Sequence, residues 1–188
     1  MALACQGLVL DAMRLVGVGA SVAAGQVVAR LDPENELNDL RSAQAALTAA
    51  RSTAPFPAEE LQATTLSVIG MGKAGARELN YISDVDVIFV AGSVGDAIEQ
   101  HRALQIATHL AQSLTRILND AGVEPPLWEI DANLRPEGKK GALVRSVDSH
   151  RAYYERWAQN WEFQALLKAR PMAGDSVLAA EYMAAVMP

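Results

Sequence analysis

Two aspartates stand one residue apart at the start of an apolar segment, SDVDVIFV, at residues 83–90. Side chains of a β-strand alternate between its two faces, so Asp84 and Asp86 share one face while Val85 and Val87 point into the core. Carboxylate oxygens are the ligands that hard divalent cations prefer in proteins. The spacing therefore predicts a divalent-cation site on one face of this strand.

A third carboxylate comes from a later segment. Residues 128–133, WEIDAN, alternate apolar and polar side chains and predict a strand that carries Asp131 on one face. This strand follows one long helix and can return beside the strand of Asp84 and Asp86. Two aspartates at i and i+2 can bridge two metal ions, and transfer of a nucleotidyl group needs such ions on the attacking and leaving oxygens. We therefore expect Asp84, Asp86 and Asp131 to be the catalytic and metal-binding carboxylates.

A glycine-rich turn precedes the aspartate pair. Residues 70–75 read GMGKAG and satisfy GxGxxG after an apolar strand that begins near Leu66. A dinucleotide-binding fold would next need a full crossover helix and an acidic residue at the carboxyl end of the second strand. Only about eight residues separate Gly75 from Asp84, and the acidic pair opens the second strand instead. The arrangement favours a nucleotidyltransferase, in which the amides of the turn and the Lys73 ammonium would hold phosphates.

Each of these features also has a purely structural interpretation. An Asp-Val-Asp sequence at a strand start is commonly a solvated edge or a turn cap, and Arg135 and Arg145 would by default be surface residues. The aromatic residues between Tyr153 and Trp161 fit the buried face of a helix. Taken together, however, the glycine turn, the aspartate pair and the third acidic strand favour the functional interpretation.

Composition narrows the class of protein. Apolar residues make up 51% of the 188 residues and the net charge is -6, so no global charge attracts nucleic acid or acidic membranes. The single cysteine, Cys5, cannot form an internal disulfide, and three histidines without a Cys/His grouping argue against a zinc site. No segment reaches the roughly 20 apolar residues of a membrane span. These features predict a cytoplasmic protein without nucleic-acid or membrane partners.

Periodicity predicts an α+β fold with three regions. The first, residues 1–57, contains helices over 1–16 and 36–52 and the start of a proline-containing linker, 52–65; the second, 58–147, is the nucleotidyltransferase core; the third, 148–188, is a helical extension. Asp96 is the expected N-cap of the long helix that crosses the sheet. The expected core is a small mixed sheet with flanking helices.

Three ordered segments resemble one family. They are GMGKAGARELNYISDVDVIFV, WEIDANLRPEGKKGALVRS and YYERWAQNWEFQALLKARPMAGD, and together they lie within residues 66–175. They closely resemble the bacterial glutamine synthetase adenylyltransferase/adenylyl-removing enzymes, which belong to the DNA polymerase β-like nucleotidyltransferases. Full-length members carry two such domains: the amino-terminal one removes AMP from a tyrosine of glutamine synthetase by phosphorolysis, and the carboxy-terminal one attaches AMP from ATP.

The resemblance implies roles for individual residues. Asp84, Asp86 and Asp131 would hold two Mg²⁺ ions, and the substrates would be ATP or ADP with orthophosphate. The candidate nucleotide- and phosphate-binding residues are Gly70, Gly72, Lys73, Ser83, Arg135, Arg145, Lys168 and Arg170. The segments NYISDVDV, DANLRP and WEFQALLKAR resemble the amino-terminal, AMP-removing copy more than the other.

Three functions follow as hypotheses: removal of AMP from glutamine synthetase, its ATP-dependent attachment, or non-catalytic docking to glutamine synthetase or a PII-type signal protein. A shorter likeness lies at the front of the chain, where about 35 residues from Gly19 to Ser52 resemble the entry to the coiled-coil hairpin of bacterial membrane-fusion adaptor proteins. That likeness would give the front of the chain a separate origin.

Overall fold

A computed structural model describes residues 12–14, 29–31, 33–79, 83–119 and 129–187. The described helices are α1 (Pro33–Ser52), α2 (Ala58–Ala63), α3 (Gly72–Gly75), α4 (Gln100–Asn119), α5 (Val147–Arg156), α6 (Asn160–Leu166) and α7 (Ser176–Val186), with a 3-10 turn at Gly138–Lys140. The strands are β1 (Ala12–Arg14), β2 (Ala29–Leu31), β3 (Thr64–Gly70), β4 (Val85–Ser93), β5 (Ile130–Asp131), β6 (Val144–Arg145) and β7 (Arg170–Gly174).

A mixed sheet forms the centre of the molecule, with the strand order β5-β4-β3-β7 and with β6 beside β4. Strand β3 pairs antiparallel with β4 and with β7, whereas β5 and β6 both run parallel to β4 along the same edge. Helix α4 connects β4 to β5, as parallel neighbours require. The small mixed sheet with flanking helices that the sequence predicts is therefore confirmed.

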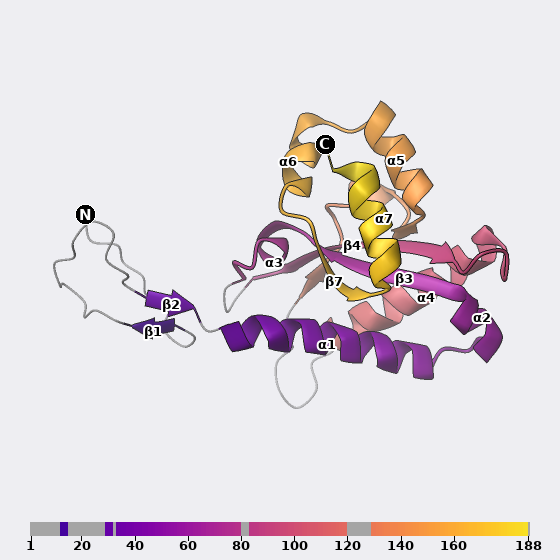
Figure 1. Cartoon of the computed structure of the whole chain (residues 1–188), viewed down its shortest axis with the longest axis horizontal. Helices are drawn as coiled ribbons and strands as arrows, with labels where there is room; N and C mark the ends of the chain where they lie inside the picture. The colour runs from indigo at the N-terminus through magenta and orange to yellow at the C-terminus, as the bar shows by residue number, and fades with distance from the viewer. Residues whose placement is uncertain (1–11, 15–28, 32, 80–82, 120–128, 188) are drawn as a thin grey trace.

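Helices cover both faces of this sheet (Figure 1). On one face, α1 and α4 pack against inward residues such as Leu66, Val87 and Phe89, which are essentially inaccessible to solvent. On the other face, α5, α6 and α7 cover Ile69, Ile88 and Val90. Strand β4 is therefore apolar on both faces beyond residue 86, and alternation places Asp84 and Asp86 on the α5–α7 side.

Helix α1 belongs to the packed body of the protein. It packs against α4 and β7, and Ala46, Leu47 and Ala50 are buried in the same core as β3 and β4. The expected helix at 36–52 is confirmed with an earlier start. The sequence analysis assigns α1 to the region before residue 57 and the sheet to the region after it, but both contribute to one core. The packing of α1 therefore gives no support to the likeness to membrane-fusion adaptors.

Several expected boundaries are wrong. Residues 12–14 form a strand paired with residues 29–31 instead of part of a helix; the rest of the helix expected at 1–16 lies outside the described residues, apart from these three. The expected linker contains α2, whose last residues lead directly into β3. Asp96 is not an N-cap, because α4 begins at Gln100.

The helical extension expected after residue 148 is interrupted by a strand. Arg170–Gly174 forms β7, which pairs with β3, because Pro171 and Gly174 prevent a continuous helix there. The side chains of Trp157 and Trp161 are 70% and 53% exposed, so these two aromatic residues are not the core residues that helical spacing indicates. Within the described residues, no helix is long and apolar enough to cross a bilayer.

Side-chain caps fix the starts of the C-terminal helices. The Ser146 side chain accepts a hydrogen bond from the Ser149 amide at the start of α5, and the Asp175 carboxylate accepts one from the Leu178 amide at the start of α7. Gln159 and Glu162 form a reciprocal capping box on α6. Each cap satisfies amides that a helix end would otherwise leave unbonded.

A histidine is buried between α5 and α7. The His150 ring packs edge-on against Tyr182 at 5.0 Å between centroids, and its Nδ1 lies 3.0 Å from the Ser146 carbonyl oxygen. Burial lowers the pKa of His150 to about 4, an effect that the Ser146 carbonyl opposes. The neutral imidazole is therefore the form that the fold accommodates.

We predict that this histidine makes the protein less stable in acid. The unfolded chain takes up the His150 proton near its ordinary pKa of about 6.5, and the folded chain does so only near pH 4. Stability is therefore fully present above pH 6.5 and falls by about 3 kcal/mol as the pH decreases to 4. Chemical denaturation of wild type and His150→Gln across this range measures the difference.

The exposed His101 provides the control for this experiment, because His101→Gln removes a histidine that solvent already reaches. The His101→Gln variant should keep the wild-type pH profile, whereas the His150→Gln profile should be flatter between pH 4 and 6.5. Parallel profiles for wild type and His150→Gln would contradict the prediction.

Candidate active site

The parallel pairing of β4 and β5 brings two of the expected carboxylates side by side. Asp86 and Asp131 are direct partners in this register, and neighbouring residues at one level of a sheet point to the same face. Asp84 lies two residues before Asp86, immediately before β4 begins, and its side chain is exposed. The structure therefore places Asp86 and Asp131 on one face at the entry of β4, with Asp84 close enough for its charge to act on Asp86.

Mutual repulsion marks this group of carboxylates. The pKa of Asp86 is raised, first by partial burial, then by the charges of Asp131 and Asp84, whereas the ammonium of Lys73 acts in the opposite direction. A raised carboxyl pKa means that the protein environment disfavours the negative charge. A divalent cation would relieve this repulsion, so the donor set fits such an ion chemically.

The carboxylates are near one another without forming a closed ligand cage. In the part of the chain that the structure describes, no three histidine, cysteine or acidic side chains are gathered closely enough to hold one metal ion. Asp131 Oδ1 accepts a hydrogen bond of 2.6 Å from the Asn133 amide, which orients that carboxylate. These carboxylates would have to move closer together to share a cation.

The glycine turn lies directly against Asp86. The Met71 amide donates a hydrogen bond of 2.8 Å to the Asp86 carbonyl oxygen, so the turn begins beside β4. Gly72 follows with φ +49°, and a Cβ there would lie well inside van der Waals contact of the Asp86 carboxylate. Lys73 Nζ lies 3.3 Å from the hydroxyl of Ser83, at the start of the SDVD sequence. The expected turn, lysine and aspartates thus form one assembly.

Close packing explains the other two glycines of the motif. A Cβ at Gly70 would overlap the Met172 side chain, and a Cβ at Gly75 would overlap the backbone carbonyl of Lys168. The glycines let the turn approach β7 and β4, which is a structural reason for the GxGxxG pattern without a dinucleotide.

Arg135 holds a loop beside the third carboxylate. Its Nη1 donates to the Ala132 carbonyl oxygen at 2.6 Å and its Nε to the Gly141 carbonyl oxygen at 3.3 Å. The side chain therefore joins the two ends of the loop between β5 and β6. Burial lowers the pKa of Arg135, and the nearby Asp131 charge opposes that change. Arg135 lies near the carboxylates, and two of its donors are used by the loop.

Arg145 lies on β6 and faces several partners. Its Nη2 forms an ion pair with Glu137, its Nη1 lies 3.4 Å from the Ser149 hydroxyl, and its guanidinium lies 5.9 Å from the Tyr153 ring centroid. Glu137 has φ +63°, an uncommon backbone conformation for this residue type. The structure therefore uses Arg145 to hold the loop that follows Asp131.

The remaining two expected phosphate-binding cations lie on the outer side of the glycine turn. Lys168 Nζ forms an exposed ion pair of 2.9 Å with Glu78. Arg170 donates from Nε to the Gly75 carbonyl oxygen at 3.2 Å and from Nη2 to the Ala74 carbonyl oxygen at 3.1 Å. The structure thus brings both cations to the turn, but it directs these donors to protein atoms.

Two contacts near the site are not predicted by the sequence analysis: the partner of Arg145 and the close approach to Gly75. Glu137 is the ion-pair partner of Arg145. Its Pro-Glu-Gly sequence predicts a turn but gives no indication of the ion pair. Gly75 belongs to the GxGxxG pattern, but its close contact with the Lys168 carbonyl depends on the pairing that leads into β7, which the sequence analysis does not predict. A signal for β7 exists in the extended Arg-Pro-Met-Ala-Gly sequence.

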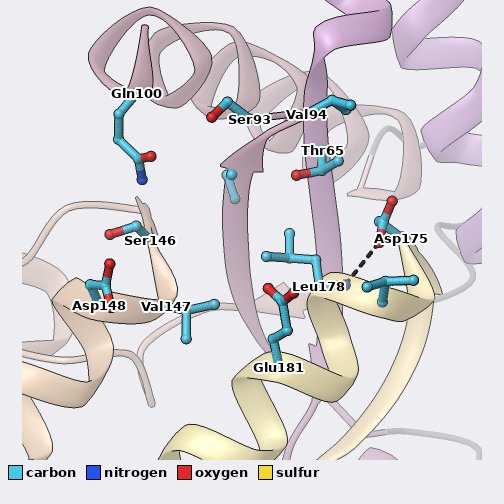
Figure 2. Close-up of a pocket in the computed structure, with 13 residues that line it drawn as sticks. Thr65, Ser93, Val94, Gln100, Ser146, Val147, Asp148, Asp175, Leu178 and Glu181 are labelled. Atoms are coloured by element: carbon cyan, nitrogen blue, oxygen red, sulfur yellow. Dashed lines mark hydrogen bonds between the residues drawn. The ribbon is translucent and has the colours of Figure 1, made fainter. Parts of the chain in front are cut away.

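A separate polar cavity of about 370 Å³ lies at the other end of β4, near Ser93 (Figure 2). None of the expected site residues lines it. Its carboxylates include Asp175, which caps α7 by accepting from the Leu178 amide at 2.8 Å, and Asp148, which pairs with Arg151. The structural partners of these two carboxylates account for their positions.

The mixed sheet, with its glycine turn facing carboxylates on two adjacent parallel strands, is that of a DNA polymerase β-like nucleotidyltransferase domain. Residues 35–185 match the family model described as glutamate-ammonia ligase adenylyltransferase, and the chain belongs to this family. The family predicted from the sequence motifs is therefore confirmed. The matched region contains nearly all of α1.

Curated relatives agree with this assignment. The chain is 55% identical over 161 residues to a bifunctional glutamine synthetase adenylyltransferase/adenylyl-removing enzyme of Leifsonia xyli, a match that covers 81% of this chain and 16% of the relative. It is 51% identical over 175 residues to the protein of that name from Streptomyces coelicolor, covering 89% of this chain and 17% of the relative. The chain thus spans about a sixth of the length of these relatives.

We predict that Gly72 tolerates alanine less well than another glycine in the same backbone region. Gly95 has φ +54° and open space around its Cβ position, so Gly95→Ala should cost only the left-handed conformation, about 1 kcal/mol. Gly72→Ala adds the overlap with the Asp86 carboxylate and should cost at least about twice as much. Urea denaturation of the two variants measures the difference, and equal losses would contradict the prediction.

Proposed function

We propose that this chain is a Mg²⁺-dependent nucleotidyltransferase unit that acts on glutamine synthetase and removes AMP from its adenylylated tyrosine. The observation that carries the proposal is the register of Asp86 beside Asp131, with Asp84 on the same face and the glycine turn against them. The printed names of the relatives supply the protein substrate, and the motifs that resemble the amino-terminal copy favour removal over attachment.

The carboxylates would hold the cation. Asp86 and Asp131 lie side by side, and the charges of Asp131 and Asp84 help to raise the pKa of Asp86. Bound Mg²⁺ would supply electrostatic stabilisation of the charge on the reacting phosphate oxygens. The Asn133 amide bonds one oxygen of Asp131 and so orients this carboxylate beside Asp86.

Lys73 is the cation best placed to contact phosphate. Its ammonium interacts with the Asp86 charge and lies near the hydroxyl of Ser83, the residue that precedes Asp84. In the proposed reaction an orthophosphate oxygen attacks the adenylyl phosphorus and the bond to the tyrosine oxygen breaks. ADP forms, and the tyrosine oxygen takes a proton. Lys73 and Ser83 would orient the phosphate groups during this step.

The direct test supplies the 188-residue chain with AMP-modified glutamine synthetase, orthophosphate and Mg²⁺ and measures ADP. A parallel reaction with ATP and unmodified glutamine synthetase measures AMP attachment. ADP release without AMP attachment supports removal; attachment alone would replace the proposal with the opposite direction. A folded, Mg²⁺-saturated chain that does neither would refute it.

We predict that Asp86→Asn and Asp131→Asn each reduce ADP formation about 100-fold or more, because each removes a charge from the group that stabilises the reacting phosphate. Asp96→Asn is the matched control, since Asp96 is exposed in the turn after β4, at the far end of that strand. Its rate should stay within about twofold of wild type. Steady-state ADP release measures all three.

Variants of the two aspartates in the SDVD sequence address a docking role. If Asp84→Asn and Asp86→Asn leave binding to glutamine synthetase unchanged and no Mg²⁺ dependence is found in any assay, the chain is a binding unit for that partner. A PII-type signal protein as a second partner and a cytoplasmic location remain proposals of the same kind.

A further inference from the structure

The start of β7 closes around the glycine turn from the side opposite the carboxylates. We call Lys168–Arg170 the clasp. In the sheet, Arg170 is the register partner of Gly70, so the clasp runs beside the residue at which the turn begins. Its proximity to the turn is thus fixed by backbone pairing.

Arg170 bonds two backbone carbonyls, those of Ala74 and Gly75, at the end of the short helix α3. The last carbonyls of a helix lack the usual intrahelical donor, and the Ala74 carbonyl here accepts a long bond of 3.4 Å from the Arg77 amide. Arg170 donates to both, at 3.1 and 3.2 Å, from two nitrogens of one planar group. A guanidinium can hold two acceptors in fixed geometry, which a single ammonium cannot do.

The packing of the clasp leaves the turn little freedom. The Lys168 carbonyl lies so close to Gly75 that no side chain fits there. The exposed Lys168–Glu78 ion pair adds a second link, but solvent screens such a pair and its contribution is small. Arg170 is therefore the dominant side-chain contact of the clasp.

The other end of the turn is bound to β4. The Met71 amide donates to the Asp86 carbonyl oxygen at 2.8 Å, and Gly72 packs against the Asp86 carboxylate. A shift of residues 74 and 75 would therefore be transmitted through one helical turn to the atoms that confine Asp86. The turn thus contacts β7 through Arg170 and β4 through Asp86.

We propose that Arg170 is a positioning residue: it fixes the glycine turn through the carbonyls of Ala74 and Gly75 and so sets the position of the Asp86 carboxylate. It acts on the carboxylate group through the backbone and does not contact phosphate. The part of this inference that concerns cation binding rests on the proposed function; the part that concerns the turn does not.

Hydrogen exchange of the turn tests the inference directly. The amides of Gly75, Ala76 and Glu78 are bonded to carbonyls within the turn at 2.8–3.1 Å. Arg170→Lys keeps the charge but replaces two donor nitrogens in a rigid plane with one nitrogen on a flexible chain, so these amides should exchange about tenfold faster than in wild type. Arg151→Lys is the matched control, since Arg151 makes an exposed ion pair within α5. Its turn amides should exchange at the wild-type rate.

A second measurement separates positioning from general destabilisation. Titration with Mn²⁺, followed by electron paramagnetic resonance without nucleotide, should show several-fold weaker binding for Arg170→Lys and none of this effect for Arg151→Lys. Arg170→Gln, which retains one amide donor, provides an independent variant if Arg170→Lys does not fold.

The outcomes are distinct. Unchanged exchange of the turn amides in Arg170→Lys would overturn the inference, as would weaker phosphate or ADP binding with normal exchange and normal Mn²⁺ affinity, which would make Arg170 a direct ligand. Faster exchange with unchanged Mn²⁺ affinity would reduce Arg170 to a structural residue and overturn its positioning role. If wild type itself binds no Mn²⁺, the proposed function fails, and the exchange result still decides whether the clasp holds the turn.

Discussion

One electrostatic constraint governs this structure: the carboxylates of Asp84, Asp86 and Asp131 lie close together at the entry of β4 and repel one another. The parallel register of Asp86 beside Asp131 forces two like charges to the same level, and Asp84 adds a third nearby. A fold that needed only stability would separate such charges or pair them with cations. Their position side by side, with the Lys73 charge acting against the repulsion on Asp86, is the feature on which the proposed cation site rests.

The rest of the scaffold resists this repulsion. Beyond Asp86, β4 is apolar on both faces and lies between two cores, one built with α1 and α4 and one with α5–α7. Strand β5 is only two residues long, so its position depends on the Asn133 amide, on the Asn119 side chain that accepts from the Ile130 amide, and on the loop that Arg135 and Arg145 hold. A short strand with side-chain anchors fixes Asp131 where a longer ladder would otherwise be needed.

The sequence was sufficient for features that depend on local periodicity. Asp84 and Asp86 share a face because strands alternate, and the return of Asp131 follows from one intervening helix; the structure has both. It was insufficient where long-range pairing decides the local state. Strand β7 forms because β3 offers an unpaired edge; the Arg170–Gly174 sequence is compatible with an edge strand, but it does not identify the strand with which it pairs. The N-terminus of α4 likewise begins four residues after Asp96, because the turn after β4 occupies the intervening residues.

Charge alone does not show which partners a cation has in the fold. Arg135, Arg145, Lys168 and Arg170 were assigned to phosphate because cations near a polyanion site suggest it, yet each has protein acceptors in the structure. Sequence can locate a guanidinium near a site, but it cannot show whether backbone carbonyls compete for its donors. Two of these arginines bond carbonyls at both ends of a loop or at the end of a short helix, where unbonded acceptors are unavoidable. A site built from short strands and tight turns creates many such acceptors. Such a site therefore uses arginines to bond its own backbone, so a positive charge near the carboxylates is not by itself a sign of phosphate binding.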